Sequence, residues 1–219
     1  PLVLVFIRSF GSEEGPFASY VNVFTSPSFG TAVLNSFSSA AVSSIITVII
    51  AFILAYTVNN TNLPKWFKKA LEVITVFPML LPTITYGFAV LHSFGKEGLL
   101  TRLLGFQLFD MYGFKGMVLG YVIYTLPVAF LLINNTFKYI DKRFIVVSRV
   151  MGDNKFRTFM ITCVRPMLGT LGAAFVQAFF LSFTDFGIPE AIGGEFEVVA
   201  GMLYTEMLGS VPNFNNGAV

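Results

Sequence analysis

The feature that most constrains this chain is a series of apolar runs that carry almost no charge. Residues 37–58 contain no charged side chain and as a helix would cross roughly 30 Å of hydrocarbon. Asn35 and Ser36 precede this run as candidate N-cap residues. Backbone polar groups in lipid must be satisfied within the segment, so the pattern predicts an all-α, polytopic membrane helix bundle. Further apolar runs follow at residues 71–94, 116–134 and 167–183.

Composition agrees with a membrane protein. Hydrophobic residues make up 55% of the chain and charged residues 12%, against about a quarter charged in soluble domains. The net charge of +2 is small and unevenly placed, which indicates a role in membrane orientation rather than in nucleic-acid binding. The single cysteine, Cys163, excludes an intrachain disulfide framework or a cysteine metal cluster. No phosphate-cradling glycine motif or nucleophile–base pattern is present, so we expect no catalytic residues and no cofactor.

Two features mark candidate positions on a substrate path. Pro78 and Pro82 lie about one turn apart in the run 71–94 and should kink it, either as a hinge beside a path or as a structural bend. Asp185 directly follows the last run and either faces a water-filled path or ends a helix at the outer interface.

The longest charged interval spans residues 140–167 and, with Lys138, holds seven of the fourteen basic residues. The pattern predicts one helix around Ile145–Val150, a turn at residues 152–154 and a second helix over 155–164 that stops at Pro166. Two short helices between apolar spans suggest a contact for a soluble partner. The alternative is a basic cytoplasmic loop that only sets membrane orientation.

This interval resembles the EAA loop of the permease subunits of binding-protein-dependent ABC importers. Gly152 falls on the glycine of that pattern, and residues 146–148 fall where Glu-Ala-Ala would be. Residues 155–159 match the basic and aromatic run that follows. The glutamate is absent, and Pro166 comes one residue later than the pattern. A side chain at Gly152 is expected to clash or to force a positive φ.

The resemblance implies a type I importer permease core whose loop docks on a separate ATPase subunit, where ATP would be hydrolysed. It further implies a substrate-binding protein outside and a second permease subunit or fused half. The stretches SFTDFGIPEAIGG and VVAGMLYTEMLG are most similar to permeases for ferric iron, 2-aminoethylphosphonate or polyamines. The residues expected to couple to the ATPase are Ser148, Arg149, Gly152, Asp153, Lys155, Arg157, Phe159 and Pro166.

Orientation follows from counting spans. If the coupling loop is cytoplasmic, ten basic residues lie inside and four outside, in agreement with the positive-inside rule and with a multi-pass protein of the bacterial inner membrane. The predicted segments are the end of a truncated span (1–7), an external connection (8–36), the permease core (37–208) with its coupling loop (138–166), and the start of a truncated final segment (209–219).

A second class of function stays open at this level. An ion-gradient-driven secondary transporter would also be a bundle of apolar helices, but it usually carries ionisable residues within its spans. Residues 37–58 and 116–134 carry none. A membrane-anchored scaffold that transports nothing is a third interpretation, against which the kinked, small-residue-rich spans argue. Dependence of uptake on ATP rather than on membrane potential separates the first two.

Overall fold

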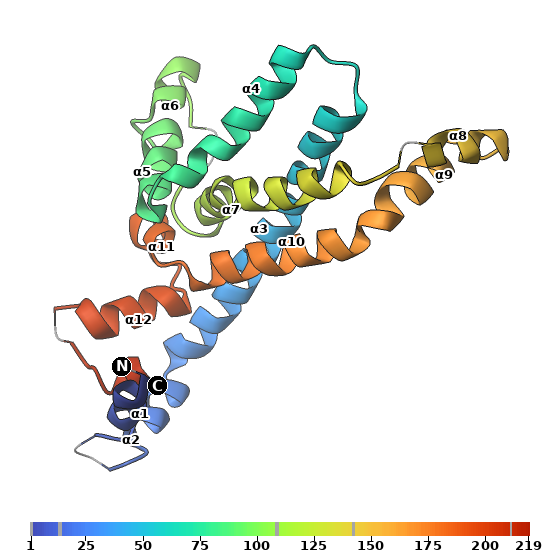
Figure 1. The fold of residues 1–219 in the computed structure, drawn as a ribbon. Coiled ribbons are helices and arrows are strands. Elements are labelled where there is room, and N and C mark those ends of the chain that lie inside the picture. Colours follow the sequence, from blue (N-terminus) through green and yellow to red (C-terminus); the bar gives the residue numbers. More distant parts are fainter. Residues whose placement is uncertain (1, 13–14, 108–109, 142, 211) are drawn as a thin grey trace. The chain divides into compact units, whose positions relative to one another are not determined.

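The computed structural model describes residues 2–12, 15–107, 110–141, 143–210 and 212–219 (Figure 1). Residues 13 and 14, within the expected external connection, and residue 142, within the charged interval, lie outside these residues. Most of the described residues are helical and none of them forms a strand, which confirms the all-α class. The elements are α1 (Leu2–Ser9), α2 (Ala18–Thr25), α3 (Pro27–Asn60), α4 (Lys65–Val76), η1 (Phe77–Leu80), α5 (Thr83–Phe94), α6 (Leu99–Leu104), α7 (Phe114–Phe137), α8 (Arg143–Val150), α9 (Lys155–Phe159), η2 (Met160–Val164), α10 (Arg165–Thr184), α11 (Gly187–Ile192), α12 (Val199–Leu208) and η3 (Asn216–Ala218).

Three stretches of helix within the described residues are long and apolar enough to cross a membrane. They are Pro27–Asn60, Phe114–Phe137 and Lys155–Thr184, and the pair Lys65–Leu80 and Thr83–Leu104 adds a fourth if it is counted as one broken span. The chain is therefore a multi-pass membrane protein. It divides into two compact units, one formed by Pro1–Ala40, Pro82–Gly120 and Phe183–Val219 and the other by Ala41–Leu81 and Tyr121–Ser182.

The first span begins earlier than expected, because α3 starts at Pro27, where the fixed φ of proline suits the first turn of a helix. Residues 8–36, predicted as an external connection, contain helix α2 and the first turns of α3. Asn35 and Ser36 lie inside α3 and do not cap it. They hold the start of α12 instead: the Asn35 amide donates to the Glu197 carbonyl at 2.8 Å, and the Ser36 hydroxyl accepts from the Val199 N–H at 2.9 Å.

The predicted span 71–94 is broken rather than kinked. Helix α4 already starts at Lys65, before the predicted start of the run at residue 71, and η1 ends at Leu80. Leu81 and Pro82 then have extended backbone before α5. Pro82 disfavours the helical conformation of Leu81 and has no N–H to donate. Two prolines so close together therefore divide the run into two helices.

The second helix of the charged interval does not stop at Pro166, which was the expectation. Helix α9 continues through the π-helical turn η2 into α10. In this turn the Arg165 N–H donates to the Met160 carbonyl, five residues earlier. The hydrogen-bond register therefore shifts just before Pro166, and the missing proline N–H falls where the helical ladder is already changing.

The unit formed by residues 41–81 and 121–182 is held by an apolar core and by polar pairs between helices. Its fully buried side chains include Phe130, Ile133 and Met167. Ser43 and Ser44 of α3 are also buried. Their burial favours a role in close helix packing over a role as a polar lining of a substrate path. The polar pairs are Thr47–Thr125 at 2.9 Å, Asn59–Asn134 at 2.6 Å, Thr136–Thr170 at 3.2 Å and Ser43–Ser182 at 3.4 Å.

The other unit is organised around α11, which lies beside α5 (Figure 1). Gly87 makes this contact possible, because a Cβ there would approach the Cβ of Ala191 to 2.4 Å. Ile188 is fully buried and packs at Gly120. The Phe186 and Tyr204 rings stack with centroids 5.3 Å apart, which ties the start of α11 to α12.

Candidate functional site

The turn between α8 and α9 is a complete Schellman motif. The Asp153 N–H donates to the Ser148 carbonyl at 3.1 Å, and the Gly152 N–H donates to the Arg149 carbonyl at 3.0 Å. Gly152 has φ +82°, the left-handed conformation that this motif requires of its glycine. A Cβ at Gly152 would meet nothing within 4 Å. The expected clash is therefore absent, and the backbone conformation alone accounts for glycine.

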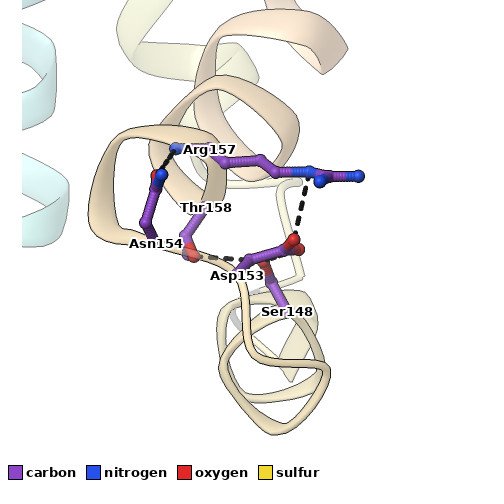
Figure 2. Close-up of polar contacts among 5 residues, drawn as sticks. All are labelled: Ser148, Asp153, Asn154, Arg157 and Thr158. Carbon is purple, nitrogen blue, oxygen red and sulfur yellow. Dashed lines mark hydrogen bonds and ion pairs between the residues drawn. The ribbon is translucent and has the colours of Figure 1, made fainter.

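Side-chain bonds close the same turn (Figure 2). The Ser148 hydroxyl donates to the Asp153 carboxylate at 2.7 Å and lies 3.1 Å from the Thr158 hydroxyl. The other carboxylate oxygen of Asp153 pairs with Arg157 Nε at 3.0 Å. Asn154 caps α9 by accepting the Arg157 N–H at 2.8 Å. These groups satisfy one another, so the two short helices are held at a fixed angle without help from a partner.

Phe159 connects the turn to the membrane helices. Its ring lies 5.6 Å from that of Tyr56 and 6.1 Å from that of Phe52, both on α3. Phe159 therefore packs against α3 and is half-buried, and its expected role in coupling stays a prediction. Ser148 and Thr158 are buried. Pro166 is exposed and lies in the first turn of α10.

The outward face of the turn is basic and apolar. Arg149, Lys155 and Arg157 are exposed, as expected for residues that meet a partner. The apolar side chains around them were not expected as site residues. They have no side-chain hydrogen-bonding groups to mark them, and a helical pattern alone does not separate exposed from core positions. They are Val146, Val147, Val150, Met151 and Phe156, with 51% to 82% of each residue exposed.

A polar cavity of about 650 Å³ lies beside the turn. Arg149, Asp153 and Lys155 line it together with Asn60 at the end of α3. The Asn60 amide approaches Cys163 Sγ at 3.7 Å, so the lone cysteine serves as a small buried side chain. No group of His, Cys, Asp and Glu within the described residues could hold a metal ion.

The candidate path residues lie in different settings. Pro78 is part of η1 and Pro82 precedes α5. Asp185 follows α10 and is only 7% exposed, and its carboxylate accepts the Ile188 N–H at 2.9 Å. Burial raises the pKa of this carboxyl group, against the hydrogen bonds from Ile188, Thr83 and Gly187. These contacts make Asp185 part of the connection between α10 and α11.

The fold and the turn together define a class: a multi-pass, all-α membrane protein with a preformed, outward-facing loop between two of its spans. Comparison with known proteins narrows the class. Residues 47–214 match the family described as binding-protein-dependent transport system inner membrane component, and the chain belongs to this family. Its fold is that of a type I ABC importer permease core.

Individual relatives agree. A putative ferric transport system permease protein of Haemophilus influenzae is 24% identical over 218 residues, 96% of this chain and 34% of that protein. A ferric transport system permease protein of Actinobacillus pleuropneumoniae is 26% identical over 96% of this chain and 31% of its own length. The chain thus spans about a third of these relatives. A chain of a bacterial ABC transporter involved in alginate import superposes with a TM-score of 0.74 at 13% identity, over 99% of this chain and 80% of that one.

Proposed function

We propose that the chain forms the substrate-conducting permease of an ATP-driven importer and couples to a separate ATPase subunit through residues 140–167. One observation carries the proposal: the α8–α9 turn satisfies its polar groups internally and leaves apolar side chains exposed. Its outward face therefore combines apolar area with Arg149, Lys155 and Arg157, a composition suited to a protein interface with a basic rim.

The route from this turn into the membrane is short. Helix α9 continues through η2 into α10, and Phe159 rests on α3. A push on α9 by a closing ATPase dimer would therefore reach two spans directly. Rigid-body movement of packed helices is a common way to switch between conformations, and here it would open the path alternately to the two sides.

The remaining partners and the substrate follow from the family. ATP would be hydrolysed on the partner subunit, and a binding protein would deliver substrate outside, against residues 8–36 and the acidic region of Glu190, Glu195 and Glu197. A second permease subunit or fused half would complete the path. The substrate would be ferric iron, a phosphonate or a similar small solute, and the location the bacterial inner membrane.

Pro78, Pro82 and Asp185 stay proposals for the substrate path. Broken helices in transporters expose backbone carbonyl groups at binding sites, which supports the two prolines. For Asp185 the engaged carboxylate supports a positioning role. Uptake by the Asp185→Asn variant separates a positioning role from a role on the path. The amide oxygen of asparagine can still accept the Ile188 N–H, so retained uptake means positioning. Lost uptake with an intact fold means that the charge itself lines the path.

The central test is co-purification of the full-length protein with its ATPase subunit, comparing Gly152→Val with Gly152→Asn. Valine opposes a φ of +82°, whereas asparagine tolerates it, and neither side chain meets a neighbour at Cβ. We expect ATPase to be retained by the native protein and Gly152→Asn and lost by Gly152→Val. If the native protein retains no ATPase, the proposal fails, and gradient-driven uptake should be measured next.

A further inference from the structure

A groove of about 450 Å³ lies between α4–η1 and α7, within the unit of residues 41–81 and 121–182. Its walls are apolar: Val73, Phe77 and Leu80 on one side and Leu131 on the other are 42% to 79% exposed. Three ionisable groups line it as well, and they are Lys69, Glu72 and Lys138.

The charged residues and the apolar wall lie in different parts of α4 and η1. Its basic residues Lys65, Lys68 and Lys69 fall in the first turns, and no charged residue follows Glu72 before Leu80. From Lys69 to Leu80 the helical rise spans roughly 16 Å, and one leaflet of hydrocarbon is about 15 Å deep. On α7, Lys138 follows the last helical residue, Phe137, while Leu131 lies two turns inside. Both lysines therefore stand at one end of an apolar groove one leaflet deep.

The two ammonium groups are available for a ligand. Lys69 pairs with Glu72 only at 3.9 Å, with 76% of the lysine side chain exposed, and such surface pairs contribute little. Lys138 is exposed and has no ion-pair partner among the described residues. Lys68 differs, because its ammonium donates to the Thr61 carbonyl at the end of α3 at 2.6 Å.

We propose that this groove binds one anionic phospholipid, with the phosphate group on Lys69 and Lys138 and an acyl chain along Val73, Phe77, Leu80 and Leu131. Net positive charge at the interface end and an apolar wall of leaflet depth match such a lipid in both chemistry and length. Trp66, which is 71% exposed one turn before Lys69, would lie at the headgroup level, where tryptophan is enriched. The inference rests on the groove and is independent of coupling to an ATPase.

Trp66 supplies the probe, since it is the only tryptophan of these 219 residues. The full-length protein is reconstituted in bilayers that contain either phosphatidylglycerol or phosphatidylcholine with brominated acyl chains, which quench nearby tryptophan. The fluorescence of Trp66→Phe is subtracted to remove any other tryptophan. We expect brominated phosphatidylglycerol to quench Trp66 more strongly, with about a five-fold loss of selectivity for each of Lys69→Gln and Lys138→Gln.

Lys65→Gln is the matched control, because it removes the same charge from the same helix at a residue that does not line the groove. It should keep most of the selectivity. Three results would overturn the proposal. Equal quenching by the two lipids means no headgroup recognition. An equal loss in Lys65→Gln and Lys69→Gln means a diffuse basic surface. Absence of quenching by either lipid means that protein, such as a second permease, covers the groove.

Discussion

The α8–α9 turn and the α11 connection solve the same problem, a short helix attached to a membrane span, in opposite ways. In the turn, Gly152 stands in open space and is required for its φ of +82°. Beside α11, Gly87 has an ordinary backbone conformation and is required because Ala191 leaves no room for a Cβ. Gly152 is needed for the backbone conformation of the turn, and Gly87 is needed for the close approach of two helices.

The aspartates of the two elements also differ, because one makes local bonds and the other is buried between helices. Asp153 keeps 15% of its side chain exposed and bonds to Ser148 and Arg157 within ten residues of itself. Asp185 is buried and joins the end of α10 to α11 and to Thr83 on α5. The turn is thus stabilised by local bonds and exposes apolar side chains, whereas α11 is stabilised by burial of Ile188, Pro189 and Ile192. A surface that meets partners can be built in the first way without risk to the fold.

The largest effect is expected from Gly87→Leu. A Cβ alone would lie 2.4 Å from that of Ala191, so α5 and α11 must separate, at a cost of about 1–3 kcal/mol or more. Thermal unfolding in detergent, followed by circular dichroism, should show a clearly lower Tm. Gly30→Ala is the control, because Gly30 lies in α3 with no atom within 4 Å of a Cβ. An unchanged Tm in Gly87→Leu would contradict the close packing of α11.

Asp185→Ala should rank second. It leaves the buried N–H of Ile188 without its acceptor, which costs roughly 1–3 kcal/mol, whereas Asp185→Asn keeps an acceptor oxygen. The same unfolding measurement should show a lower Tm for the alanine variant and a nearly native one for asparagine. Equal losses in both variants would mean that the charge, rather than the hydrogen bond, stabilises this connection.

Ser148→Ala should cost less, about 1 kcal/mol, because the Schellman bonds of the backbone remain when the hydroxyl is removed. The effect should be confined to the turn. Hydrogen exchange measured by mass spectrometry should therefore increase in peptides that cover α8 and α9 and stay native in α5 and α11. Faster exchange throughout the chain would show that the turn is not an independently stabilised element.

Phe156→Ala should have the smallest effect on the fold. The residue is 73% exposed, and exposed substitutions usually change stability by less than about 0.5 kcal/mol. If the outward face of the turn meets an ATPase, co-purification should nevertheless fall, while Leu103→Ala, an 80% exposed residue on α6, should leave it unchanged. Equal ATPase recovery from both variants would remove Phe156 from the proposed interface.

Much of this architecture was predictable, because lipid leaves a chain few choices. Charge-free runs predicted α7 and most of α3 and α10, and Pro127 inside α7 did not interrupt it. The errors fall at span ends and at prolines. The start of α3 was set too late, since Asn35 and Ser36 match a local cap signal although their partners lie over 160 residues away. A break at Pro78 and Pro82 was expected only as a kink, because local rules do not tell how far the chain turns once its hydrogen bonds are lost.

The sequence by itself determined the class of protein, the number of apolar runs and the position of the turn at Gly152, because each depends on hydrophobicity or on local backbone chemistry. The tertiary structure alone decided which side chains face outward. It turned Ser148 and Phe159 inward, left Val150, Met151 and Phe156 exposed, buried Asp185, and brought Lys69 and Lys138 to one groove. These outcomes depend on contacts between segments far apart in the chain, and the residue pattern of one segment does not indicate which other segments pack against it.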